Sequence, residues 1–205
     1  VLDSTETLDP ITPPFVPNDA SPISEGDLTK VLEALSAAKR PLIITGPQAN
    51  STRQPIASKT LSDAFSMPLV CLESARGLSD SFYGDLGSVL EATDLIIHLG
   101  KVADYSTGVH TKGKIAPGAS IISILTDDQN APALNSGTEK TLDLTVIKAG
   151  NIPATMLQLA AAIAKNDATR PNPEWSQRLN AGISRRLDWQ AGKSRHPASL
   201  SADLH

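Results

Sequence analysis

The chain alternates between two hydrophobic periods, and this alternation limits the folds open to it more than any other feature. Continuous apolar runs at 42–45, 69–72, 95–99 and 120–125 predict short buried strands, and a weaker run at 142–147 alternates with polar residues. Between these runs, apolar residues recur every three or four positions, as in amphipathic helices. Buried strands that alternate with helices predict an α/β fold, a doubly wound and mostly parallel Rossmann-like sheet with helices on both faces.

Three helices can be placed from their apolar stripes. The first should begin after Ser24, where Asp27 completes a short variant of the capping box, and should end before Pro41. The last should have Pro153 in its first turn. The stripes of the three helices are, in order, Leu28, Val31, Leu32 and Leu35; Ala57, Leu61, Ala64 and Phe65; and Met156, Leu159, Ala160 and Ile163.

Composition excludes several functional classes. Hydrophobic residues make up 40% of the chain but aromatic residues only 3%, so the core must be aliphatic. A formal net charge of −4 argues against a nucleic-acid partner, and no run approaches the ~20 apolar residues that cross a membrane. The single cysteine, Cys71, excludes an internal disulfide, fits a cytoplasmic location and is expected to be a buried structural residue.

Prolines divide the chain into three parts. Residues 1–23 contain five prolines among short polar residues and predict an extended inter-domain linker. Residues 24–170 hold the periodic core, and 171–205 predict a helical segment and a linker towards a further domain. The chain begins at Val1, without an initiator methionine or a signal peptide, so we expect it to be a fragment of a longer protein.

No catalytic or metal-binding motif is present in the sequence. The glycine-rich dinucleotide fingerprint is missing after the first strand, where Gly46-Pro47-Gln48 stands instead, and Pro47 has no backbone N–H for a phosphate. His98 lies within a predicted strand, and we interpret it as a hydrogen-bonded core residue rather than a catalytic base. We therefore predict no catalytic residue and no metal ligand in this chain.

Polar residues at the carboxyl ends of the strands are the remaining candidates for a ligand site, because parallel sheets bind ligands at that edge. A cofactor would lie in the groove that these loops form, with a lysine as phosphate partner and an aspartate as ribose or adenine acceptor. The same residues could instead only solvate loops and cap helices, and the sequence leaves both interpretations open. The candidates are Gly46, Gln48, Gly100, Lys101, Asp104, Asp127 and Asp128.

Four segments resemble the central domain of thiamine diphosphate-dependent enzymes of the acetolactate synthase and benzoylformate decarboxylase type, a DHS-like NAD/FAD-binding domain. Ala38–Gly46 resembles the family's A-K-R-P-(apolar)-G opening, and Met67–Val70 its (I/L)-P-V-V strand. Ala92–Gly100 resembles (A/S)-D-(apolar)-(apolar)-x-(L/F)-G, and Ala116–Ile124 resembles A-P-x-A-x-I-I-x-I-D. The four segments follow the family's order and spacing within residues 30–165.

The resemblance implies a parent enzyme, a carboligase (transferase) or a 2-oxo acid decarboxylase (lyase), that uses thiamine diphosphate and magnesium. It also implies flanking pyrimidine- and pyrophosphate-binding domains that hold this cofactor, and a homodimeric or homotetrameric parent. Acetolactate synthases bind FAD through this domain, with a glycine-rich turn and an arginine where Gly46-Pro47-Gln48 and Lys101 stand here. These departures predict no tightly bound FAD, and a weakly bound ADP stays open.

Two alternatives belong to other functional classes. A sirtuin-like deacylase would need a glycine-rich NAD loop, a catalytic histidine and usually a zinc-binding set of cysteines, and one cysteine without such a loop argues against it. A stand-alone nucleotide-binding or oligomerisation module without catalysis remains the alternative to a fragment of an enzyme.

Overall fold

Five parallel strands form one sheet in the order β2-β1-β3-β4-β5. The computed structural model describes residues 21–49, 53–72, 85–107, 115–127, 129 and 143–182. The strands are β1 Pro41–Thr45, β2 Val70–Cys71, β3 Leu95–Leu99, β4 Ser120–Leu125 and β5 Asp143–Lys148. The parallel α/β sheet predicted from the apolar runs is confirmed, with every predicted strand present.

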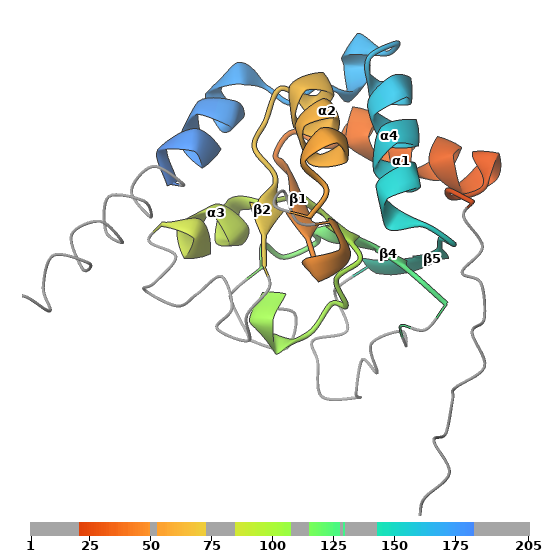
Figure 1. Ribbon diagram of the computed structural model, residues 1–205. Helices are drawn as coiled ribbons and strands as arrows, with labels where there is room; N and C mark the ends of the chain where they lie inside the picture. Colours follow the sequence, from red (N-terminus) through yellow and green to blue (C-terminus); the bar gives the residue numbers. More distant parts are fainter. Residues whose placement is uncertain are drawn as a thin grey trace, which may run out of the picture.

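Helices pack on the sheet as its topology requires. They are α1 Glu25–Ala37, α2 Pro55–Phe65, α3 Leu86–Ala92 and α4 Ile152–Ile163, with 3-10 turns η1 Pro47–Ala49, η3 Tyr105–Thr107 and η4 Asp167–Thr169. In Figure 1, α1, α2 and α4 lie together above the sheet, α3 lies beside β2, and η3 lies below. The chain leaves β1 towards β2 and later returns past β1 to β3, so right-handed connections place elements on both faces.

The helix starts follow the predicted capping chemistry. Ser24 Oγ accepts a hydrogen bond from Asp27 N at 3.1 Å and donates to the Asp27 carboxylate at 2.8 Å. Asn151 caps α4, because its Oδ1 accepts from Ala154 N at 2.8 Å, and Pro153 lies in the first turn as predicted. These contacts fix the two helices whose buried faces cover the sheet.

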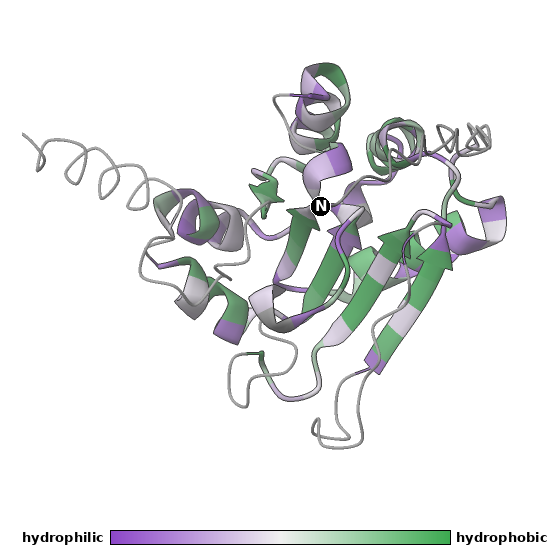
Figure 2. Cartoon of the chain, turned by 60° about the horizontal axis from the view of Figure 1, so that its bottom comes forward, coloured by the Kyte–Doolittle hydropathy of each residue, from purple (hydrophilic) through white to green (hydrophobic). Residues whose placement is uncertain are grey.

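The core is almost entirely aliphatic, as the composition predicts, with Phe65 and Trp175 as its aromatic members. Leu28, Val31 and Leu35 of α1 are buried, and all five residues of β1 and of β3 are buried. Figure 2 shows the central strands as almost continuously hydrophobic ribbons. The edge strands differ. Four of the six residues of β5 are exposed, and Cys71 in the two-residue strand β2 is half-buried, so the expectation of a buried cysteine is corrected.

Residues on both sides of the predicted core segment 24–170 are also buried in the core, although the proline pattern assigned them to linkers or a separate helical segment. Ile23, assigned to the linker, is 2% exposed, and its carbonyl accepts a hydrogen bond from Gln158 of α4 at 3.1 Å. Residues 173–182 form a helix, within the helical segment predicted after Pro171. This helix buries Trp175 and Leu179 in the same core. The residues beyond 182, and most of the predicted N-terminal linker, lie outside the described part of the chain.

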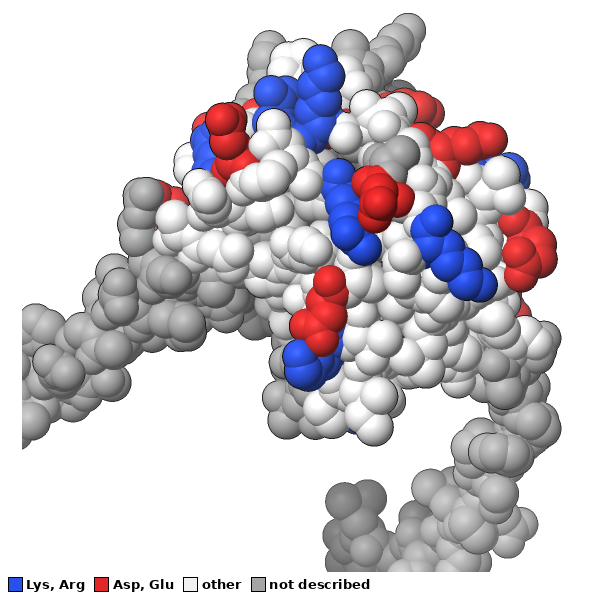
Figure 3. All heavy atoms as spheres, turned by 90° about the horizontal axis from the view of Figure 1, so that it is seen from above, with Lys and Arg blue, Asp and Glu red and all other residues white. Residues whose placement is uncertain are grey.

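Charge is mixed on the face above α2 and α4. Figure 3 shows Lys and Arg side chains interspersed with Asp and Glu side chains on this face, without a broad region of one sign. Within the described ranges, the chain forms no helix of sufficient length and apolarity to cross a bilayer.

Candidate functional site at the carboxyl edge of the sheet

Three loops leave the sheet side by side where β1, β3 and β4 end, and we call this region the carboxyl edge. The strand pairing continues one residue into each loop. Gly46 N donates to Leu99 O, and Gly100 N donates to Ile124 O, both at 2.9 Å. The structure therefore brings the loops with the predicted candidates Gly46, Gln48, Gly100 and Lys101 to one place.

The two glycines are required by packing of one loop against the other. A Cβ atom added to Gly46 would overlap the carbonyl oxygen of Gly100. Gly100 has a φ of +64°, in the left-handed region that favours glycine, and a Cβ there would lie 3.4 Å from Ile152 and 3.6 Å from Gln48. Neither glycine needs a bound phosphate to explain it, so the packing interpretation accounts for both.

Lys101 and Asp104 pair with each other across the loop after β3. Lys101 Nζ lies 2.8 Å from Asp104 Oδ2, and the lysine side chain is only 15% exposed. The second carboxylate oxygen of Asp104 accepts from Ser106 N at 2.8 Å and from Ser106 Oγ at 2.5 Å. Burial opposes ionisation of Asp104, but the hydrogen bonds from Lys101 and Ser106 outweigh it and lower the pKa of the carboxyl. The predicted phosphate partner is thus already neutralised.

Gln129 and Lys148 complete this network. Gln129 belongs to the loop after β4 that holds the candidates Asp127 and Asp128, but it was not itself selected as a site residue, and Lys148 was not predicted. Gln129 Nε2 donates to Gly100 O at 3.2 Å, and its Oε1 accepts from Thr126 N at 3.2 Å. Lys148 Nζ donates to Thr126 O at 3.0 Å and to Gln129 O at 2.6 Å. Little in the sequence indicates the role of Lys148, because its ammonium group binds backbone carbonyl oxygens and no carboxylate that could be recognised as its partner. The position of Lys148 at the end of the alternating strand β5 was the one available indication.

The two predicted aspartate acceptors contribute no described contact to this network. Asp127 is exposed and follows Thr126 in the turn after β4. Asp128 lies outside the described residues. Their proposed role towards a ribose or an adenine therefore stays a prediction.

His98 lies beneath this edge, one residue before the carboxyl end of β3. Its side chain is fully buried, and Nδ1 lies 3.1 Å from Ser123 Oγ on the neighbouring strand β4. Burial disfavours the imidazolium, and nearby Lys101 disfavours it further, so the pKa of His98 falls to about 3. Nε2 has no hydrogen-bond partner among the described residues. A neutral imidazole bound to a strand neighbour agrees with the packing interpretation.

The described residues do not fit a thiamine diphosphate–magnesium site. Within them, no three His, Cys, Asp or Glu side chains lie together in a way that could hold a metal ion. A flavin phosphate at this edge would have to displace Asp104 from Lys101, because these two side chains are paired at 2.8 Å. The contacts that the described residues make at the carboxyl edge are hydrogen bonds and one ion pair among its own loops.

Known proteins similar to this chain were found by comparison of structures and not by comparison of sequences. No family model and no curated protein matches it. A thiamine diphosphate-dependent 4-hydroxybenzoylformate decarboxylase from Rhodococcus jostii RHA1 aligns with 17% identity and a TM-score of 0.49, covering 72% of this chain and 29% of its own. A protein from Mycobacterium smegmatis, assigned as a thiamin diphosphate-dependent enzyme, aligns with 15% identity, a TM-score of 0.51 and the same two coverages.

The chain thus spans about 29% of the length of these solved structures. At 15% identity, the likeness to the Mycobacterium protein establishes the fold. The resemblance that the four sequence segments indicate is confirmed at that level. This chain has the fold of a domain that occurs within thiamine diphosphate-dependent enzymes.

Proposed function

We propose that this chain is the central domain of a thiamine diphosphate-dependent enzyme, an acetolactate synthase-like carboligase or a 2-oxo acid decarboxylase. The observation that carries the proposal is the shared fold, which covers 72% of this chain but only 29% of its structural neighbour. The remaining length of such a parent leaves room for the two domains that hold the cofactor. The four sequence segments that resemble the family lie within the same part of this chain.

Within the parent, the domain has a structural and nucleotide-binding-type role rather than a catalytic one. Its loops at the carboxyl edge satisfy one another, as Lys101 with Asp104 and Gln129 with Gly100. A polar edge that is already satisfied gains little from a ligand, because each new hydrogen bond replaces an existing one. The domain packs against its neighbours and supports a homodimer or a homotetramer.

Any nucleotide at this edge is an adenine nucleotide held weakly, and the purified protein is colourless. Lys101 would have to leave Asp104 to meet a phosphate, and as a lysine it lacks the planar fork of arginine. Asp127 or Asp128 would accept from the ribose or the adenine. Flavin absorbance in a purified preparation would contradict this part of the proposal.

Isothermal titration with thiamine diphosphate and magnesium tests the proposal as a whole. The 205-residue chain should bind neither, and the same chain extended by the flanking coding sequence should bind the cofactor and turn over a 2-oxo acid. A low-micromolar dissociation constant for the isolated chain, about 8 kcal/mol of binding free energy, would overturn the assignment. A reading frame that does not continue on both sides would favour the stand-alone nucleotide-binding or oligomerisation module instead.

A further inference from the structure

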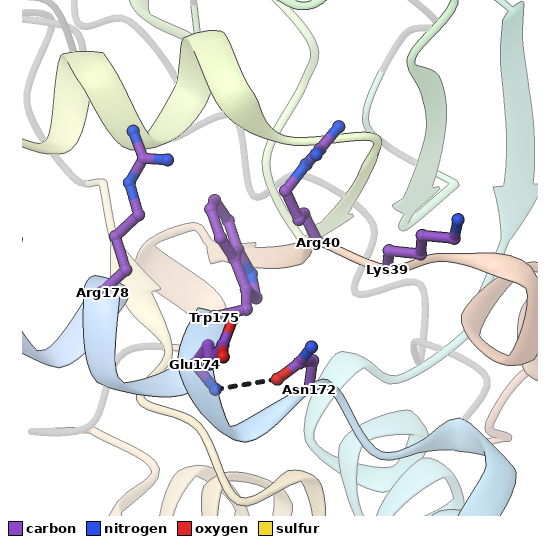
Figure 4. Close-up of a pocket in the computed structure, with 6 residues that line it drawn as sticks. All are labelled: Lys39, Arg40, Asn172, Glu174, Trp175 and Arg178. Atoms are coloured by element: carbon purple, nitrogen blue, oxygen red, sulfur yellow. Dashed lines mark hydrogen bonds between the residues drawn. The ribbon is translucent and has the colours of Figure 1, made fainter.

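A hollow of about 300 Å³ lies at the opposite edge of the sheet, where β1 begins. It is formed between the turn that precedes Pro41 and the helix at 173–182, two segments that are far apart in the sequence (Figure 4). We call this region the amino-edge pocket, and its lining residues are Lys39, Arg40, Asn172, Glu174, Trp175 and Arg178.

The backbone around the amino-edge pocket is held in place. The carboxylate of Asp94 accepts from Lys39 N at 3.0 Å and from Arg40 N at 2.8 Å, and Asp94 N donates to Arg40 O at 3.2 Å. Trp175 is 4% exposed, and its indole N–H donates to the carbonyl of Pro41 at 2.7 Å. The two walls are therefore joined to each other and to β3, so the charged side chains project from a fixed frame.

Three of the six lining residues are cations, and two of them have no partner among the residues that the structure describes. Lys39 and Arg40 are exposed, and neither side chain makes a hydrogen bond or ion pair with the part of the chain that the structure describes. Arg178 donates to Ser88 O at 3.2 Å and lies 5.7 Å from the centre of the Trp175 ring. That one hydrogen bond leaves further guanidinium donors available.

The arrangement favours an anion of small size. Glu174 is the one carboxylate among the lining residues, and the carboxylate of Asp94 lies behind them on the backbone of Lys39 and Arg40. The three cations still exceed these two carboxylates, in a chain whose net charge is −4. Figure 4 shows the side chains of Arg40 and Arg178 on either side of Trp175. The volume is at the lower end of small-molecule sites. A nucleic acid would need a much longer basic surface.

We propose that the amino-edge pocket binds a phosphate group, carried by a small phosphate monoester or present as free phosphate. Phosphate matches arginine because the guanidinium donates two parallel hydrogen bonds to two oxygens. Arg40 and Arg178 each offer such a fork on their own side of Trp175, and Lys39 adds to the positive charge of the region. This site is separate from the carboxyl edge and does not depend on the proposed function.

Isothermal titration of the 205-residue chain with inorganic phosphate and with glycerol 3-phosphate tests this site. Arg40→Ala should weaken phosphate binding by roughly fivefold or more, and Arg178→Lys, which keeps the charge but removes the fork, should also weaken it. Lys59→Ala is the matched control. This lysine pairs with Asp63 on α2, outside the lining of the pocket, and its loss should leave phosphate affinity unchanged.

Each result decides the proposal. Tighter binding of glycerol 3-phosphate than of phosphate assigns the pocket to a phosphate monoester, and equal binding assigns it to free phosphate. The proposal is overturned if phosphate does not bind, if Arg40→Ala binds as the unmodified chain does, or if acetate competes as well as phosphate. A glutamate-rich peptide that binds more tightly than either phosphate would assign the pocket to an acidic protein partner instead.

Discussion

The two edges of the sheet differ in whether their lysine and arginine side chains have partners within the described residues. At the carboxyl edge, Lys101 is paired with Asp104 at 2.8 Å and Lys148 donates to two carbonyl oxygens of the loop after β4. At the amino edge, Lys39 and Arg40 line a hollow without a described partner. The usual rule places ligands at the carboxyl edge of a parallel sheet. In this chain, the cations that pair with no described residue lie at the other edge.

The difference has a local cause at each edge. At the carboxyl edge, the loops lie so close that side chains such as Gln129 reach the backbone of the next loop. At the amino edge, the carboxylate of Asp94 accepts hydrogen bonds from the backbone N–H groups of Lys39 and Arg40. It therefore does not pair with the charged ends of these two side chains. The hydrogen bonds between loops at the carboxyl edge stabilise the fold. The charged side chains of Lys39 and Arg40 at the amino edge remain available to a ligand.

The largest expected effect tests how closely the loops pack at the carboxyl edge. Gly46→Ala places a methyl group against the carbonyl of Gly100, so the loops must separate and strain the pairing of β1 with β3. We expect a loss of about 3 kcal/mol in the free energy of unfolding, measured by urea denaturation.

Gly118→Ala is the control for this substitution. Gly118 has a φ of +77°, but a Cβ there would meet nothing within 4 Å. Its cost should be the backbone strain alone, about 1 kcal/mol. Equal losses for the two variants would show that the loops at the carboxyl edge are not tightly packed.

The fold could be predicted from the sequence because its signals are local and periodic. The apolar runs identify each strand, and Ser24 and Pro153 mark helix starts that the structure confirms. Helix α3 was not predicted, since it has only seven residues and contains Gly87. The burial of Ile23 was also missed, because its partners on α4 lie more than a hundred residues away.

The site could be predicted only in part. The sequence identified the loops that meet at the carboxyl edge, because parallel strands end on the same side. It could not show that Lys101 would pair with Asp104, since i,i+3 neighbours in a loop have no fixed geometry. The amino-edge pocket joins Arg40 to Arg178 through the burial of Trp175, and no local pattern reports such a contact.

A smaller effect concerns His98 Nε2, a buried polar atom that has no hydrogen-bond partner among the described residues. His98 has a pKa of about 3 in the folded chain and about 6.5 when unfolded. Between these values the unfolded imidazole binds a proton that the folded one does not, so stability falls as the pH drops. From pH 7 to pH 5, the free energy of unfolding should decrease by about 2 kcal/mol on account of this group.

His98→Leu isolates this contribution, because the variant has no imidazole to titrate at this position. Its unfolding free energy, measured by urea denaturation at pH 7 and pH 5, should change by about 2 kcal/mol less than that of the unmodified chain. The lowered pKa of Asp104 acts only below its ordinary value of 3.8 and leaves this window unaffected. The same pH dependence in both proteins would show that His98 is accessible to protons.

The smallest expected effect comes from a substitution that leaves Lys101 at the carboxyl edge without its partner, as Lys39 and Arg40 are at the amino edge. Asp104→Asn removes the partner charge of Lys101, while the remaining amide oxygen can still accept from Ser106 N. The freed ammonium should raise the affinity for ADP by about two- to threefold at low salt, since a partly exposed charge is screened. The gain should disappear in 0.5 M salt, where the Debye length is only about 4 Å.

Asp63→Asn is the matched control, because it frees Lys59 on α2 in the same way but away from the carboxyl edge. It should leave ADP binding unchanged in isothermal titration, whereas Lys101→Ala should weaken binding. If Asp104→Asn and Lys101→Ala both bind ADP as the unmodified chain does, the phosphates of the nucleotide do not meet the loop after β3. The ion pair of Lys101 with Asp104 then serves only to hold the loop after β3 in place. In that case the charged side chains of the carboxyl edge bind no ligand, unlike those proposed for the amino edge.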